Sequence, residues 1–508
     1  MAALLREIQT GHTPESLAAS CRGAAAVVLL RSRFFASAQA RYSFIAANPF
    51  LRFRSFGSRC EIAELAGGRL NPATIQFGNP WHVLDQLMSR YELLDEADLP
   101  FPLGGCFGFW GYDLKNFVEP KLPRRADNDL ELPDCHVGFY DSLVVFDHHL
   151  NKTWIISTGL GADGLRDESR AIQALDFWTE KLVEPPNTAG MARVPPDGLE
   201  RLELSGKARH PLIGSNLSRA EMIERIQRAQ EYIRQGHIYQ VNLSQRLCAE
   251  CDLSGWEVYQ RLSDVSPAPF SAFVDCEDFQ IASSSPELFL RLSGSGIQTR
   301  PIKGTRPRSA DPTRDTQLTY ELKTSAKEMS ELVMITDLLR NDIGKVCSFG
   351  SVHVPELARL EQYPQVQHLV STVEGRLRPG VTHFMALSAC FPGGSITGAP
   401  KIRAMEIIDE LETVSRGPYT GALGYLGFNR ESQLSIVIRS AICRRNQVFF
   451  QVGAGIVADS IPEAEYAETV TKAAGFIAAL GLPVQEEFLP RHASVIPETS
   501  PGLQSLRS

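Results

Sequence analysis

The segment Ser218–Gln245, SRAEMIERIQRAQEYIRQGHIYQVNLSQ, places a helix signal directly before a strand signal. Its first four residues are a capping box, an apolar stripe follows at helical spacing, and Gly236 ends the predicted helix. From Tyr239 onward apolar and polar residues alternate, which predicts a half-buried strand with Gln240 and Asn242 on an amide-rich face. The segment therefore predicts a helix and a strand in immediate succession.

Outward from this segment, composition divides the chain into four parts. Residues 1–183 mix short apolar runs with turn-rich stretches, and the Pro- and Gly-containing stretch 184–217 is predicted to be a linker. Residues 218–481 hold stronger and more closely spaced signals. Residues 482–508 are rich in Pro and Ser and are expected to form a flexible tail.

Further elements are predicted in the third of these parts. One long helix is expected over about residues 312–339, and another over about residues 462–481. Gly393–Gly398 is a glycine-rich loop, and Pro400 suits the first turn of a helix that the loop opens. Backbone N–H groups at such a helix start favour a bound carboxylate or phosphate.

Bulk properties exclude several classes of partner. The chain has 508 residues, a net charge of −8 and a pI of about 5.8, so nucleic acid and anionic membranes are not expected partners. It has no apolar run of 18 residues and no signal pattern at Met1–Thr10, so a cytoplasmic protein is expected. Ten scattered cysteines favour no disulfide framework. Cys248 and Cys251 form the only C-x-x-C and are interpreted as two thiols at a strand end.

Two pairs of glutamates, Glu328 with Glu331 and Glu465 with Glu468, each lie three residues apart in a predicted helix. Each pair therefore projects from one helix face. Four carboxylates on two helices could hold a hard divalent cation, and an oxygen-only set favours magnesium over zinc. Because such spacing is also usual on a solvated helix face, the pairs alone leave both interpretations open.

A single lysine, Lys303, lies beside Gly304 in the basic stretch RPIKGTRPR, residues 300–308. Glycine lets a ligand approach the backbone closely, and a lysine becomes a nucleophile when its pKa is lowered. A basic surface loop is the simpler local interpretation. Elsewhere, Gly104–Gly108 fits the cysteine elbow of a glutamine amidotransferase, but without a histidine and acid in register it is interpreted as a glycine-rich turn.

Taken together, these segments resemble the chorismate-utilising enzymes. Six sequence motifs, or phrases, occur in one order, and this outweighs the interpretations of a solvated helix face and a basic surface loop. The resemblance implies an α+β fold in which two large antiparallel sheets pack around a core, with flanking helices outside and the site in a cleft. It covers almost all of residues 218–480, and residues 1–183 match more loosely. The six phrases are YQVNLSQ at 239–245, SSPE at 284–287, PIKGT at 301–305, DLLRND at 337–342, GGSITGAPK at 393–401 and GAGIV at 453–457.

Two positions distinguish branches of this family. Lys303 is typical of the aminodeoxychorismate synthases, component I, where anthranilate synthases carry alanine. Isochorismate and salicylate synthases carry a lysine base at the position of Gln240, whose amide cannot act as a base. The resemblance thus implies amination of chorismate to 4-amino-4-deoxychorismate. Anthranilate synthase component I is the alternative within the family, and a non-catalytic ligand-binding subunit is the alternative outside it.

The resemblance also implies roles for named residues. Lys303 would attack the ring of chorismate, and Glu287 would protonate the leaving hydroxyl. Mg²⁺ would be bound by Glu331 and Glu468, with Glu328 and Glu465 acting through water. His368 matches a family histidine whose role here is unassigned, and Gln240 completes the catalytic set. The implied substrate-binding residues are Gly304, Thr305, Ser395, Tyr419, Arg439, Gly453, Ala454, Gly455 and Lys472.

Two further expectations concern partners. The chain shows no credible glutaminase domain, so ammonia is expected from a separate glutamine amidotransferase subunit in a heterodimer. Related enzymes bind tryptophan through an acidic L-L-[ED]-S motif, where this chain has LLRS at 29–32 although Pro267-Ala-Pro269 is kept. Arg31 reverses the charge that would face the ammonium group of the ligand, so tryptophan binding is not expected.

Overall fold

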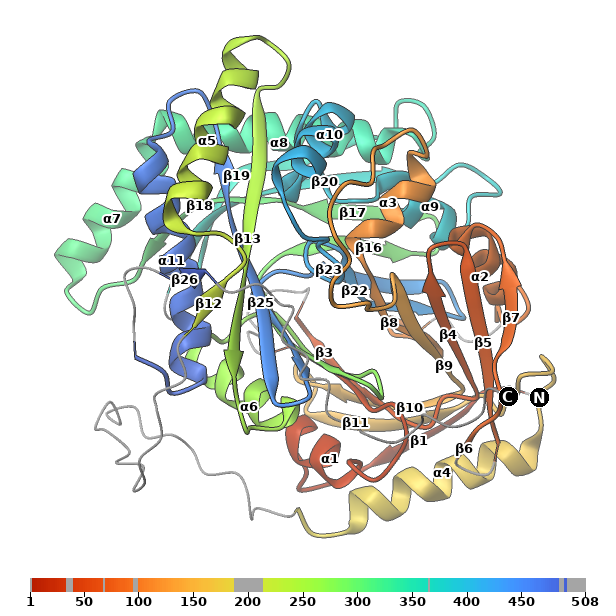
Figure 1. The fold of residues 1–508 in the computed structure, drawn as a ribbon. Helices are drawn as coiled ribbons and strands as arrows, with labels where there is room; N and C mark the ends of the chain where they lie inside the picture. Colours follow the sequence, from red (N-terminus) through yellow and green to blue (C-terminus); the bar gives the residue numbers. More distant parts are fainter. Residues whose placement is uncertain are drawn as a thin grey trace, which may run out of the picture.

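Two large sheets form the body of the molecule (Figure 1). The structure, a computed structural model, describes residues 2–32, 40–66, 69–94, 99–186, 213–363, 366–483 and 488–490. Within these residues each sheet has 13 strands, and every pairing is antiparallel except the short contact of β12 with β26. The expected α+β fold of two antiparallel sheets with flanking helices is therefore confirmed. No helix of the described residues is long and apolar enough to cross a membrane.

The first sheet runs from the N-terminal strand β1 at one edge to the C-terminal strand β26 at the other. Its order is β1 (Leu4–Ile8), β11 (Lys152–Ser157), β10 (Ser142–Asp147), β3 (Tyr42–Ala46), β2 (Val28–Arg31), β14 (Phe270–Asp275), β15 (Gln280–Ser285), β24 (Ser440–Arg444), β25 (Gln447–Ile456), β13 (Gln240–Glu250), β12 (Gly214–Ser215) and β26 (Leu489–Pro490), with β21 (Gly398–Ala399) paired to β13.

The second sheet has Lys303 on β18, a strand at one end of its order. Its order is β18 (Ile302–Pro307), β20 (Val366–Arg376), β17 (Gly296–Arg300), β16 (Leu288–Ser293), β23 (Glu431–Ile436), β22 (Ala422–Gly427), β8 (Gly105–Trp110), β9 (Cys135–Tyr140), β4 (Leu51–Phe56), β5 (Arg59–Ala66) and β6 (Arg69–Leu70), with β19 (His353–Gln362) paired to β20 and β7 (Thr74–Phe77) to β5.

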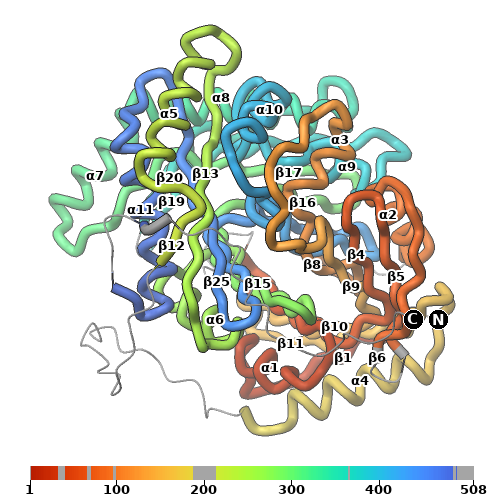
Figure 2. Tube along the Cα trace, in the orientation of Figure 1, coloured from red at the N-terminus to blue at the C-terminus, as the bar shows by residue number. Residues whose placement is uncertain are grey.

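Both sheets draw strands from both halves of the sequence. In the first sheet β2 pairs with β14, and in the second β8 pairs with β22. Figure 2 traces this exchange, with the orange β8 adjoining strands from the second half of the chain. Residues 1–183 and residues 218–481 therefore both contribute strands to each sheet. The expected linker and tail lie mostly outside the described residues.

Helices cover the outer faces. Helix α4 packs on β10 and β11, α11 on β25, and α8 on β20, so each sheet is shielded on its outer side. The helices are α1 (Pro14–Ser20), α2 (Pro80–Met88), α3 (Lys115–Val118), α4 (Glu168–Val183), α5 (Arg219–Arg234), α6 (Gly255–Val265), α7 (Pro312–Thr324), α8 (Ala326–Gly344), α9 (His383–Cys390), α10 (Lys401–Leu411) and α11 (Pro462–Ala479), with 3-10 turns η1 (Tyr112–Leu114) and η2 (Gly394–Ile396).

Aromatic side chains fill the space between the sheets. Phe44 on β3 meets Tyr425 on β22 edge to face, with ring centroids 5.1 Å apart, and Phe107 on β8 stacks on the same tyrosine at 5.3 Å. These rings belong to a buried cluster that includes Val28 and Phe449 of the first sheet. Because such rings bury large apolar areas, they hold the two sheets together.

Local end signals predicted two helices well. The capping box at Ser218 and Glu221 is formed in both directions and α5 follows it, while α11 begins at Pro462 as expected. The long helix expected over 312–339 is wrong in one respect, because it is two helices. Ser325 ends α7, and its side chain accepts a hydrogen bond from the N–H of Glu328 to cap α8.

Three other local predictions need correction. The strand from Tyr239 is buried on both faces instead of half buried, because β25 flanks it and helices α5 and α10 pack on it. Gly104–Gly108, expected as a turn, lies largely in the central strand β8. Helix α10 begins at Lys401, so Pro400 occupies its N-cap position instead of its first turn.

Candidate active site

Lys303, Gln240 and Gly455 converge from the two sheets. Lys303 is on β18 of the second sheet, and its Nζ lies 3.6 Å from the position that a Cβ on Gly455 of β25 would occupy. The Nε2 atom of Gln240, on β13, lies 2.7 Å from the same position, so any side chain on Gly455 would clash with it. Glycine is therefore needed at 455 to keep the amide and the lysine close together.

Gln240 presents an unpaired polar atom at this junction. Its side chain is 1% exposed, and its carbonyl oxygen Oε1 has no hydrogen-bond partner within the described part of the chain. Leaving a buried acceptor unpaired costs about 1–3 kcal/mol. An acceptor that is buried and unpaired in this way is suited to a ligand that donates a hydrogen bond.

Lys303 lies among carboxylates. Its Nζ is 3.8 Å from Oε2 of Glu331 on α8, and both side chains are more than four-fifths buried. Burial raises the pKa of Glu331, and the charges of Glu328 and Glu465 raise it further, while Lys303 opposes them. Lys303 thus lies beside a group of carboxylates that repel one another.

Glu287 is a buried carboxyl suited to proton transfer. Burial raises its pKa to about 7, although a hydrogen bond with Ser395 and the charge of Lys303 both lower it. A carboxyl that titrates near neutral pH carries a proton at pH 7 and can release it. The structure thus brings together Lys303, Glu287 and Ser395 from three separate phrases of the sequence.

The four glutamates expected as metal ligands do not all point to one position. Glu465 is buried and accepts a hydrogen bond from Ser460 at 2.6 Å, whereas Glu468 is half exposed and pairs with Lys472 at 2.7 Å. Among the described residues, no three His, Cys, Asp or Glu side chains stand close enough to hold a metal ion. The donor set contains only carboxylates, which suits magnesium, and magnesium binding stays a prediction.

A pocket of about 270 Å³ opens beside these groups. Arg439, His368 and Lys472 line it together with the kept Pro267 and Pro269. Pro286, the neighbour of Glu287, lies on its wall as well. Three of the expected functional residues therefore share one cavity next to the buried acid.

Arg439 is a partly buried cation that lines this pocket. Burial lowers its pKa, and within the described residues its guanidinium makes no hydrogen bond or ion pair. A buried charge without a partner is unfavourable unless a ligand supplies one. A guanidinium in this state is suited to binding a carboxylate through two parallel hydrogen bonds.

His368 and Thr305 form a pair at the pocket edge. The Thr305 hydroxyl and Nδ1 of His368 are 2.8 Å apart across β18 and β20. Burial lowers the pKa of His368 to about 4, and the charge of Arg439 lowers it further. The imidazole is therefore neutral at pH 7 and serves as a hydrogen-bonding group.

The glycine turn of β25 meets two more expected residues. Lys472 donates a hydrogen bond to the carbonyl of Gly453 at 2.8 Å. The hydroxyl of Tyr419 lies 3.1 Å from where a Cβ on Gly453 would be, and burial raises the pKa of Tyr419 to about 12. The Ala454 side chain packs in the core behind the strand, so only its backbone is available to a ligand.

Gly304 needs to be glycine for reasons of backbone and space. Its φ of +74° is in the left-handed region, and a Cβ there would lie 2.8 Å from Leu322 and 3.2 Å from Glu328. The residue after the lysine therefore lets β18 bulge toward α7 and α8. The sequence predicted a close approach by a ligand at this glycine; the structure shows a close approach by Leu322 and Glu328, and ligand contact stays a prediction.

Two sequence features carry no chemistry of their own in this structure. Cys106 is fully buried in β8 with its pKa raised well above the usual range by burial, so it is no nucleophile. Cys248 lies near the end of β13 and Cys251 just beyond it, and none of the ten cysteines, all of them described, forms a disulfide.

Arg31 is held by neighbouring side chains. Its Nε donates to Glu15 at 2.7 Å, and its Nη1 lies 3.0 Å from Nε2 of His148. Arg31 also borders a small hollow with Phe44 and Tyr425, whose volume is about 30 Å³. As bounded by the described residues, a hollow of that size has room for a water molecule.

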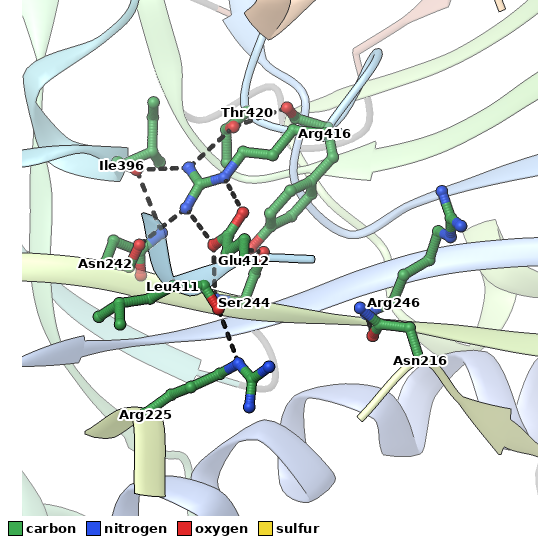
Figure 3. A network of polar contacts seen from close by, with 11 residues as sticks. Asn216, Arg225, Asn242, Ser244, Arg246, Ile396, Leu411, Glu412, Arg416 and Thr420 are labelled. Atoms are coloured by element: carbon green, nitrogen blue, oxygen red, sulfur yellow. Dashed lines mark hydrogen bonds and ion pairs between the residues drawn. The ribbon is translucent and has the colours of Figure 1, made fainter. Parts of the chain in front are cut away.

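Sequence reasoning missed a buried network behind the site. Glu412 and Arg416 form a buried ion pair and contact Asn242, Ile396 and Thr420 (Figure 3). The only signal in the sequence was the spacing of four between an acid and a base, which is common on solvated helices.

A two-sheet fold with a buried lysine, a near-neutral carboxyl and an unpaired arginine defines a class of enzyme that takes a small anionic substrate. The chain belongs to the chorismate binding enzyme family, whose model matches residues 32–478. It is thus an enzyme of the chorismate-utilising family.

The chain is similar to relatives with two different names. It is 38% identical to anthranilate synthase component 1 of Acetivibrio thermocellus, over 92% of this chain and 93% of that protein. It is 39% identical to aminodeoxychorismate synthase component 1 of Escherichia coli K12, over 88% and 91% of the two chains. Overall similarity therefore does not separate the two activities.

Solved structures agree with the fold. Anthranilate synthase component I from Streptococcus pneumoniae superposes with a TM-score of 0.70 at 32% identity, covering 88% of this chain and 94% of that one. The menaquinone-specific isochorismate synthase MenF of Escherichia coli gives a TM-score of 0.66 at 17% identity, covering 94% and 95%, which is a likeness of fold alone.

Proposed function

We propose that this chain aminates chorismate to 4-amino-4-deoxychorismate, with Lys303 as a covalent nucleophile. The observation that carries the proposal is the position of Lys303, a buried amine 3.8 Å from Glu331 and within electrostatic reach of the protonatable Glu287. Lysine here is the residue typical of the aminodeoxychorismate synthase branch, and several relatives bear that name.

The proposed reaction has two displacements. Lys303, as a free amine, attacks C2 of the chorismate ring while Glu287 gives its proton to the departing C4 hydroxyl, which leaves as water. Ammonia then attacks C4 and expels the lysine. A carboxyl with a pKa of about 7 can supply the proton of the first step at neutral pH.

Other residues bind and orient the reactants in this scheme. Arg439 would hold a substrate carboxylate, and the backbone of Gly453–Gly455 would contact the ring with Tyr419 and Lys472 beside it. The unpaired Oε1 of Gln240 is available to accept a hydrogen bond from ammonia. His368, neutral at pH 7, would orient Thr305.

Magnesium is the proposed cofactor. Glu331 and Glu468 would bind it, with Glu328 and Glu465 around them, and the cation would neutralise a substrate carboxylate. Burial and, to a smaller extent, the charges of Glu328 and Glu465 raise the pKa of Glu331, and a divalent cation would stabilise its ionised form.

The ammonia donor is proposed to be a separate glutamine amidotransferase. The relatives are named as component 1, which implies a second component in their systems. Ammonium salts at high pH should then support turnover by the isolated chain, whereas glutamine should not. Glutamine use by the isolated chain would contradict a separate partner.

Product analysis tests the proposal. The chain is incubated with chorismate, ammonium and magnesium, and the products are identified by mass spectrometry. Formation of 4-amino-4-deoxychorismate without pyruvate is expected. Anthranilate with pyruvate would support the second candidate, anthranilate synthase, which the 38% identical relative favours. If no chorismate is consumed, a non-catalytic subunit becomes the better description.

A further inference from the structure

The guanidinium of Arg416 uses all of its hydrogen-bonding capacity inside the protein. Its side chain is 1% exposed. Nε and Nη2 donate to the two carboxylate oxygens of Glu412 at 2.8 and 2.6 Å, and Nη2 also donates to the carbonyl of Asn242 at 2.7 Å. Nη1 donates to the carbonyl of Ile396 at 3.1 Å and to the Thr420 hydroxyl at 3.2 Å. A guanidinium has five N–H groups, and these are five bonds.

These contacts join segments that are far apart in the sequence (Figure 3). Asn242 is on β13, two residues after Gln240, and its own side chain donates to the carbonyl of Ile396 at 3.2 Å. Ile396 follows Ser395, the hydrogen-bond partner of Glu287. One guanidinium therefore links the strand that carries Gln240 to the turn that carries Ser395.

The same group holds the segment of Tyr419. The Thr420 hydroxyl accepts from Arg416 and donates to the carbonyl of Tyr419 at 2.6 Å. Glu412 in turn accepts two hydrogen bonds from Ser244 on β13, at 2.8 Å from its N–H and 2.9 Å from its hydroxyl. The ion pair thus fixes both ends of the connection between α10 and β22 against β13.

An ion pair buried this deeply is a poor source of stability. Charges taken out of water lose hydration that their mutual attraction only partly returns, and apolar pairs of the same volume are often as stable. A guanidinium whose donors are all engaged fixes the geometry around it, because its planar fork matches the carboxylate and each remaining N–H donates in one fixed direction.

We propose that Arg416, held by Glu412, is a positioning residue of the chorismate site that sets Ser395 and Tyr419 relative to Gln240. The inference rests on the proposed function. Arg416 acts through its neighbours, since its five donors are all engaged with protein atoms. Loss of its geometry should misplace groups that bind chorismate even where the fold persists.

The test compares steady-state kinetics with chorismate, ammonium and magnesium. Arg416→Lys keeps the charge beside Glu412 but offers three donors in place of the five-donor fork, so kcat/KM should fall at least about tenfold with a raised KM for chorismate. Thr420→Val removes one contact and should raise KM by about threefold or more, whereas Thr420→Ser keeps the hydroxyl and should restore KM to within twofold.

Arg41→Lys is the matched control. Arg41 also binds a carboxylate through two nitrogens, with Nη2 2.5 Å and Nε 3.0 Å from Asp147, in a part of the first sheet away from the site. Because Arg41 is 33% exposed, Arg41→Lys should lower the melting temperature by less than Arg416→Lys does, and it should leave the KM for chorismate unchanged. If Arg416→Lys does not fold, the Thr420→Val and Thr420→Ser pair decides.

Two results overturn the inference. One is wild-type kcat/KM in Arg416→Lys or, if that variant does not fold, in Thr420→Val. The other is a loss of activity that follows the melting temperature alone and that Arg41→Lys reproduces, because the pair would then be structural. If the wild-type chain consumes no chorismate, the proposed function and this inference are both contradicted. Wild-type kinetics are measured first, so this outcome is distinguished from an effect of a variant.

Discussion

Two guanidinium groups, 23 positions apart in the sequence, have opposite surroundings. Arg416 spends all five donors on protein atoms, whereas Arg439 faces a pocket and has no partner among the described residues. The region around Arg416 is complete without a ligand, and we call it the closed region. The region around Arg439, Lys303 and Glu287, the open region, has charges and buried polar groups that a ligand would satisfy.

The difference teaches how to separate structural from functional charges. Arg416 is fully buried and Arg439 partly buried, so neither is a solvated surface charge, and what distinguishes them is the pairing of the guanidinium. A charge paired inside the protein contributes to the folded geometry, and one left unpaired carries an unfavourable free energy that binding can offset. Changes in the open region should therefore reduce activity and spare stability, and changes in the closed region should reduce stability first.

The largest effect is expected for Lys303→Ala in the open region. Formation of 4-amino-4-deoxychorismate should fall by roughly 10⁴-fold or more, the scale on which enzymes lose rate with a covalent nucleophile. The free energy of unfolding should change by less than about 1 kcal/mol. Product mass spectrometry and urea unfolding measure the two quantities. Lys152→Ala, which removes an exposed pair with Glu7, is the control, and equal turnover in both variants would refute a nucleophilic lysine.

Next comes Arg416→Met in the closed region. It leaves the carboxylate of Glu412 buried and uncompensated, so the free energy of unfolding should fall by about 3–5 kcal/mol. The double variant Glu412→Gln/Arg416→Met removes both charges and should recover most of that loss. Urea titration of the three proteins is the measurement, and a single variant as stable as wild type would remove the distinction between the regions.

Arg439→Met should reduce activity and not stability, the reverse of Arg416→Met. Loss of a charge-assisted contact to a substrate carboxylate should lower kcat/KM for chorismate by about 2–3 kcal/mol, or roughly 30- to 150-fold. The free energy of unfolding should stay equal or rise, because an unpaired buried charge is removed. Urea unfolding beside steady-state kinetics checks both. Destabilisation as large as that of Arg416→Met would mean that Arg439 has a protein partner outside the described residues.

The smallest effect is a pH dependence. Burial raises the pKa of Glu287 to about 7, and only its protonated form can donate to the leaving hydroxyl. At a constant concentration of free ammonia, kcat should therefore be retained below pH 7 and fall above it, by up to about tenfold per pH unit. Glu287→Gln should lower kcat and abolish that decline. A decline that persists in the glutamine variant would assign it to another group.

Signals that act over a few residues were predicted correctly. The capping box at Ser218, the start of α11 at Pro462 and the stop at Gly236 depend on hydrogen bonds and backbone preferences within one turn. The break at Ser325 was missed, because a serine is tolerated inside a helix and also caps one. Only the packing of α7 and α8 against β18 selects the second use.

The residues of the site also fall into those that the sequence indicated and those that it did not. Lys303 and Glu287 were found because they lie in motifs that resemble a family, Arg439 was carried over from the same resemblance, and the roles of all three stay predictions. Arg416 was missed because its partners at 242, 396 and 420 are distant in sequence and include backbone carbonyls, which no residue pattern reveals.

By itself, the order of residues determined where the chain starts and stops its helices, which class of substrate its phrases point to, and which side chains could react. Only the tertiary structure decided which of those side chains are paired and which are left open. The physical reason is that pairing and burial depend on contacts between strands separated by up to hundreds of residues, whereas caps and alternation are settled by neighbours along the chain.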